Sequence, residues 1–176
     1  PGLSFAGQHS SFLNVIGGDA IAAAVKDCWA SLWTAQAMAY RHENDVDHAA
    51  VAMGVVVQQM VHSDVSGIMF TANPATGDRS EMIINASFGL GEAVVSGQVT
   101  PDTYLINRDT DEITTTIGAK EQQIVADNND GGAAGGGGGG AASGSGGGVR
   151  LEDIEEEKRG ASSLDDAQIK ELVASA

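Results

Sequence analysis

Basic side chains are scarce in this sequence. Lysine and arginine together number 9 against 24 aspartates and glutamates, which gives a formal net charge of −15 over 176 residues. A chain this acidic repels a phosphate backbone, so we expect no nucleic-acid partner. The excess of carboxylates is typical either of adaptation to high salt, where screening relieves self-repulsion, or of an ordinary acidic cytoplasmic protein.

Cysteine and long apolar runs are scarce as well. Cys28 is the single cysteine, which excludes an internal disulfide, and its apolar surroundings predict a small buried core residue. No apolar run approaches the ~20 residues that span a bilayer, so we expect no membrane partner. The four histidines lack metal-ligand spacing, and we predict no metal ligand in the sequence. The sequence begins at Pro1 without a signal-like region, which favours a cytoplasmic piece of a longer chain.

The pattern of apolar residues predicts an α+β fold, with a mixed or antiparallel sheet and flanking helices. Short β-branched runs between turn residues predict strands at 53–57, 67–71, 82–84, 103–107 and 112–117, followed by an extended segment at 120–126. Apolar residues at three-to-four spacing predict one helix over 18–41, with Asp19 as N-cap and with Trp29 and Trp33 as core anchors.

Two shorter helices are predicted further along the chain. Gly89-x-Gly91 resembles the start of a dinucleotide fingerprint but lacks its third glycine, so a turn and a short helix at 92–95 fit better. Asp165 caps a second helix that runs through Ile169 and Leu172.

A glycine-rich tract divides the chain. Residues 128–148 are nearly all Gly, Ala, Ser and Asn, which predicts a disordered linker rather than a phosphate loop. The organisation that follows is a folded body at 1–127, a linker at 128–150, and a charged segment with a helix of the same domain at 151–176.

Polar residues at two places could recognise a nucleotide. Gln58 and Gln59 follow an apolar run, as an adenine-binding edge requires, although spacing alone favours surface residues at a strand end. Gly7, Gln8, Ser10 and Ser11 could present N–H and O–H groups to an anion, although a plain turn with a Ser cap is the more ordinary explanation.

Three long motifs resemble the ATP-binding domain of phosphoenolpyruvate synthase, which pyruvate phosphate dikinase and rifampicin phosphotransferase share. The motifs are SFAGQ…FLNV near the start, VVVQQMV at 55–61, and SGIMFTANPATGDR…INASFGLGEAVVSGQVTPD at 66–102. The resemblance covers about 1–126 and resumes near Ser163. It implies a partial ATP-grasp fold, ATP with Mg²⁺, and partners elsewhere in a parent chain: a domain whose histidine carries the phosphoryl group and a domain that binds pyruvate.

The same resemblance assigns site residues. Gly7 matches an ATP-contacting glycine, Ser11 a nearby hydroxyl position, and Gln58 the glutamine of the strand that meets adenine, while Gln8 and the backbone of Met60 are secondary candidates. The family's triphosphate-binding Lys and Arg, its magnesium carboxylates and its catalytic histidine match nothing in this sequence. We therefore expect no catalytic residue here, and we expect these residues alone to bind ATP poorly. Two alternatives stay open: an antibiotic-phosphorylating relative of the rifampicin phosphotransferase type, and a non-catalytic nucleotide-binding remnant.

Overall fold

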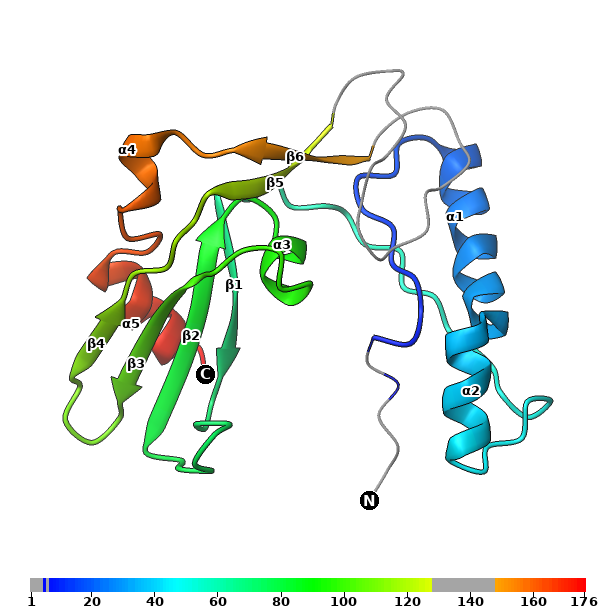
Figure 1. The fold of residues 1–176 in the computed structure, drawn as a ribbon, viewed down its shortest axis with the longest axis horizontal. Helices are drawn as coiled ribbons and strands as arrows, with labels where there is room; N and C mark the ends of the chain where they lie inside the picture. Colours follow the sequence, from blue (N-terminus) through cyan, green and yellow to red (C-terminus); the bar gives the residue numbers. More distant parts are fainter. Residues whose placement is uncertain (1–4, 6, 128–147) are drawn as a thin grey trace. The chain divides into compact units, whose positions relative to one another are not determined.

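The computed structural model describes residues 5, 7–127 and 148–176, drawn in colour in Figure 1. The chain divides into two compact units. The first unit comprises Pro1–Val61 with Ala126–Arg150, and the second comprises His62–Val125 with Leu151–Ala176. Within the described residues, no helix combines the length and the apolar character needed to cross a bilayer.

The helices of the first unit are α1 (Gly18–Ala30), the 3-10 turn η1 (Ser31–Trp33) and α2 (Ala35–Glu43). The prediction of one continuous helix over 18–41 was wrong, because hydroxyl groups interrupt it. The Ser31 hydroxyl donates to the carbonyl of Cys28 at 2.6 Å, and Thr34, in an extended conformation, accepts from the Ala37 amide as the N-cap of α2. Such local side-chain bonds offer the backbone an alternative to the helix.

Two further predictions for these helices were wrong. The N-cap of α1 is Gly17, and Asp19 lies in the first turn instead. Trp29 and Trp33 are 49% and 57% exposed, so neither is a core anchor. Small side chains fill the buried positions of α1, which are Ala20 and Ala24. The buried face of α1 therefore consists of small side chains and not of the large rings.

The predicted strand at 53–57 is also absent, since residues 51–64 have no strand or helix assignment. Val56 is 84% exposed and Val57 is 61% exposed. A β-branched run favours extended backbone, but a strand also requires a neighbour that pairs with it. Within the described part of the chain, this segment has no such neighbour.

The second unit is built on an antiparallel four-stranded sheet in the order β1 (Val65–Phe70), β2 (Glu81–Phe88), β3 (Asp102–Asn107), β4 (Ile113–Thr116). The strands predicted in this region are confirmed, and neighbours in the sheet are neighbours in sequence. The short helix α3 (Glu92–Val95) lies between β2 and β3, as predicted.

The core of the second unit forms where α5 (Asp166–Ala174) covers one face of this sheet (Figure 1). The buried residues alternate along the strands, as a half-buried sheet requires. They are Met82, Ile84, Ala86, Tyr104, Ile106 and Ile169. The capping of α5 by Asp165 is confirmed, and the structure adds a full capping box with Gln168.

A separate two-stranded sheet pairs β5 (Gln122–Ala126) with β6 (Val149–Asp153), and α4 (Glu156–Arg159) follows. The predicted disordered tract lies outside the described residues except for Gly148. Val149 and Arg150, which the sequence analysis placed in the linker, belong to β6.

Candidate functional site

The loop around Gly7 has a backbone shape that favours glycine. Gly7 has φ 73°, in the left-handed region, and a Cβ added there would meet no atom within 4 Å. The Gln8 amide donates to the carbonyl of Phe5 at 3.1 Å, and the Gln36 side chain of α2 donates to the carbonyl of Gly7 at 3.4 Å. The glycine is therefore required by the turn, and its outer side is open.

Aromatic rings support this loop from the helix side. The Phe5 ring lies edge-on to Tyr40 with centroids 5.6 Å apart, and it stacks on His9 at 6.3 Å. The thiol of Cys28 on α1 donates to the carbonyl of Ser10 at 3.5 Å. Cys28 is half-buried rather than fully buried, and burial followed by the charge of Asp27 raises the pKa of its thiol.

The side chains predicted to meet the phosphates differ in exposure. Ser11 is exposed and has no hydrogen-bond partner among the described residues, so its hydroxyl is available to a ligand. Gln8 is half-buried, and its Oε1 atom is buried without a partner, as is Nδ1 of the neighbouring His9. Unpaired buried polar atoms are uncommon in proteins, and here they concentrate in the loop that the sequence assigns to phosphate binding.

The second segment of the candidate site, residues 53–61, lies against α1 and this loop. The indole N–H of Trp29 donates to the carbonyl of Met53 at 3.2 Å. The sulfur of Met60 accepts from the Asn14 amide at 3.1 Å. Gln58 is exposed and has no hydrogen-bond partner within the described ranges, so its amide can pair with a ligand.

All the predicted site residues thus lie in the first unit, and Asn14 joins Met60 to the loop that carries Gly7, Gln8 and Ser11. Gln58 is hydrogen-bonded to none of them. Cations are few in this unit. Arg41 is 1% exposed, donates to Nδ1 of His48 at 3.0 Å and lies over the Trp33 ring, so it does not reach solvent.

Comparison with known proteins places this arrangement in a family. Residues 1–136 match the family described as pyruvate phosphate dikinase, AMP/ATP-binding domain. The chain belongs to that family. The match contains the whole loop around Gly7, the segment 53–61 and the sheet β1–β4.

Curated relatives carry the names of two kinds of phosphotransferase. A probable phosphoenolpyruvate synthase of Pyrococcus horikoshii is 54% identical over 121 residues, which are 69% of this chain and 15% of the relative. A rifampicin phosphotransferase of a Streptomyces species is 52% identical over 120 residues, which are 68% of this chain and 14% of the relative. This member of the family therefore spans about 15% of the length of the first of these relatives.

The described residues of this AMP/ATP-binding family member contain no group of three His, Cys, Asp or Glu side chains that could hold a metal ion. They therefore do not fit a magnesium site built from protein side chains alone. Magnesium that accompanies a nucleotide usually takes its ligands from the phosphates, from water and from one or two carboxylates.

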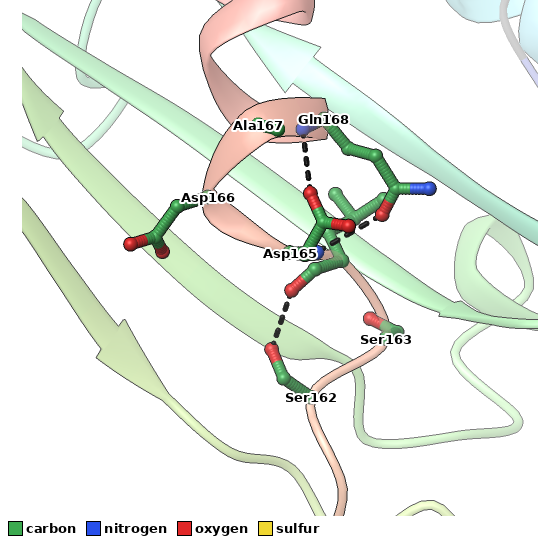
Figure 2. Close-up of a pocket in the computed structure, with 7 residues that line it drawn as sticks. Ser162, Ser163, Asp165, Asp166, Ala167 and Gln168 are labelled. Carbon is green, nitrogen blue, oxygen red and sulfur yellow. Dashed lines mark hydrogen bonds between the residues drawn. The ribbon is translucent and has the colours of Figure 1, made fainter.

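A pocket lies at the start of α5 in the second unit. It has a volume of about 710 Å³ and is lined by residues 162–168 at the start of α5. Figure 2 shows that local groups already pair there: Asp165 accepts from the Gln168 amide at 2.8 Å, and the Ser162 hydroxyl donates to the carbonyl of Leu164 at 2.8 Å. Two carboxylates at this helix end disfavour a phosphate.

One buried charged pair was missed by the sequence analysis. Asp102 and Lys120 form an ion pair in which both side chains are 0% exposed. The Asp102 carboxylate also accepts from the amides of Gly118 at 2.8 Å and Ser163 at 2.7 Å. A signal was present, because Asp102 is in phase with the inward residues of β3, and a buried charge requires a partner.

Proposed function

We propose that the chain binds ATP as the central part of an ATP-grasp domain in a dikinase of the phosphoenolpyruvate synthase type. The observation that carries this proposal is the family match over residues 1–136, which includes every predicted site residue. Support from the structure is local: the exposed Ser11 and Gln58 have unpaired polar groups, and Gly7 leaves open space beside its turn.

Each segment then has a distinct role in binding. The loop at Gly7–Ser11 offers backbone N–H groups and the Ser11 hydroxyl to the phosphates. The amide of Gln58 and the backbone of Met60 meet the adenine base, while Gln8 is a secondary phosphate contact. The body carries a formal charge of −15, so these groups orient a nucleotide but do not neutralise its charge.

In the complete dikinase, the β-phosphoryl group of ATP moves to a histidine of another domain and then to pyruvate, so that ATP, pyruvate and water give AMP, phosphoenolpyruvate and phosphate. Phosphoryl transfer depends on positioning and on charge neutralisation by Lys, Arg and magnesium. This chain supplies part of the positioning, and the Lys, Arg and magnesium ligands belong to other parts of the parent protein. A cytoplasmic location stays a prediction.

A second acceptor is supported by a specific observation: the rifampicin phosphotransferase is 52% identical, close to the 54% of the phosphoenolpyruvate synthase. The nucleotide half of the reaction is the same for both. Assays of a complete protein carrying these residues, with ATP and either pyruvate or rifampicin, separate the two by which acceptor drives AMP formation. If neither pyruvate nor rifampicin drives AMP formation, both assignments are overturned.

Isothermal titration of the 176-residue chain with ATP tests the binding role. We expect a dissociation constant weaker than about 100 μM, because cations that clamp the triphosphate are not in this chain. A titration with AMP should give an affinity within about threefold of that for ATP, since the base contacts remain and few phosphate charges are matched. Micromolar affinity for ATP would contradict the expectation of weak binding.

Gln58 and Gln59 provide a matched pair of variants, because the two amides are adjacent and both are exposed. Gln58→Ala is expected to weaken ATP about fivefold to tenfold, the effect of losing one or two hydrogen bonds to the base. Gln59→Ala is expected to leave the affinity unchanged. An NMR titration measures both even in the millimolar range, and equal effects of the two variants would remove Gln58 from the site.

A further inference from the structure

Asn14 contacts separate parts of the first unit from one position. Its backbone amide donates to the sulfur of Met60 at 3.1 Å. The two N–H bonds of its side-chain amide donate to the carbonyls of Asp127 at 2.9 Å and Gly148 at 2.8 Å. Its own carbonyl accepts from the Gly148 amide at 3.0 Å. One residue thus fixes the end of the Gly7 loop, the segment that holds Gln58, and the two chain positions on either side of the glycine-rich tract.

The backbone of Asn14 explains why an asparagine serves here. Its φ is 51°, in the left-handed region that asparagine adopts more readily than most residues. It is 8% exposed, so water does not compete well for its amide. The carbonyls of Asp127 and Gly148 need a donor with two N–H bonds, which an aspartate of the same shape lacks.

The hydrogen bonds that join Asn14 to Met60, Asp127 and Gly148, called the clamp below, are completed by a direct bond between the last two residues. The Asp127 amide donates to the carbonyl of Gly148 at 2.9 Å, so these two positions are joined directly as well as through Asn14. Both belong to the same compact unit as the candidate site. Met60 is therefore linked through Asn14 to the hydrogen-bonded pair of residues 127 and 148.

We propose that Asn14 is a positioning residue of the nucleotide site, which holds the Gly7–Ser11 loop and Gln58–Met60 in register without touching the nucleotide. This inference rests on the proposed function. Loss of the side-chain donors removes two of the hydrogen bonds that tie Asn14 to residues 127 and 148, shifts the loop and moves Met60, so that the phosphate and base contacts no longer form together.

The test variant is Asn14→Asp, which keeps the shape and the tolerance of positive φ but sets a carboxylate against two carbonyls. Asn44→Asp is the matched control, because Asn44 also donates through its side chain to a carbonyl, that of Tyr40 at 2.8 Å, but outside the site. The probes are ATP itself and ¹³C-methyl methionine, whose Met60 signal reports the sulfur contact in the folded protein.

We expect Asn14→Asp to weaken ATP about tenfold and to move the Met60 methyl signal, while Asn44→Asp changes neither. A purely structural role would lower the melting temperature but leave both readings of the folded protein unchanged, and that result would overturn the inference. If the wild type binds no ATP, the proposed function fails, while the Met60 signal of Asn14→Asp still decides whether the clamp positions that segment.

Should Asn14→Asp not fold, Met60→Leu provides the second variant. It replaces only the sulfur acceptor by an apolar group of similar volume and leaves the Asn14 side-chain bonds intact. We expect ATP affinity to fall about threefold with the melting temperature little changed. An unaltered affinity would overturn the positioning role.

Discussion

Replacing Asp102 with asparagine is expected to lower the free energy of unfolding by about 3–5 kcal/mol, because the charge of Lys120 is left buried without its counter-charge. Both side chains are 0% exposed. Besides the neutral amide oxygen at position 102, the partners of the Lys120 ammonium among the described residues are the carbonyl of Gly118 at 3.3 Å and the Phe88 ring, and none of them carries a negative charge. Urea unfolding followed by circular dichroism measures the loss.

Two controls show whether the loss comes from the buried pair. Lys158→Met removes an exposed pair with Glu155, whose side chains are 63% and 78% exposed, and should cost less than about 1 kcal/mol. The double variant Asp102→Asn with Lys120→Met should be more stable than Asp102→Asn alone, since no buried charge remains. Additive losses in the double variant would contradict the account.

The pH dependence gives an independent check of the same carboxylate. Burial raises the pKa of Asp102, but hydrogen bonds from Lys120, Ser163 and Gly118 outweigh it and lower the pKa overall. A lowered folded pKa contributes stability that is fully present above the unfolded value of about 3.9 and is lost as pH falls through the folded value. The stability difference between wild type and Asp102→Asn should therefore shrink below about pH 4.

Much of the second unit could be predicted because its signals are local. Strands β1–β4 coincide with alternating or β-branched runs that end in turn residues. The start of α5 is indicated by Asp165 and Gln168, which form a capping box within four residues. Predictions for the first unit were weaker because its structure depends on features that the local sequence does not encode. Nothing near residues 53–57 in the sequence states whether another strand pairs with them, and the break at Ser31 depends on hydroxyl groups that also suit a helix surface.

From the sequence, the candidate site is a prediction of single residues and not of an arrangement. Gly7, Ser11 and Gln58 follow from the motifs that contain them. Asn14 does not, because its bonds join residues 46, 113 and 134 positions away in the sequence. Polar contacts between residues far apart in the sequence produce no periodic pattern in it. The role proposed for Asn14 could therefore be inferred only from the folded structure.

Gly89→Ala is expected to destabilise the second unit by about 3–5 kcal/mol. A Cβ at this position would lie 2.4 Å from the carbonyl oxygen of Ile124, which already accepts from the Leu90 amide at 2.8 Å. The φ of 77° adds the strain of a left-handed alanine, about 1–2 kcal/mol, to the displacement of backbone. Urea unfolding measures the sum.

Alanine variants of two other glycines separate the backbone strain at Gly89 from its steric clash. Gly97 has φ 70° and open space around it, so Gly97→Ala should cost only the strain, about 1–2 kcal/mol. Gly91 has φ −63° and meets only the Cβ of Ser66 at 3.4 Å, so Gly91→Ala should cost less than about 1 kcal/mol. If Gly89→Ala costs no more stability than Gly97→Ala, the steric clash is refuted.

The surroundings of Gly89 also bear on the Gly89-x-Gly91 pattern. At a glycine that lets a phosphate approach, the space that a Cβ would fill is open to the ligand. At Gly89 that space is occupied by the backbone of Ile124. The Gly89-x-Gly91 pattern is therefore explained by packing in the turn between β2 and α3.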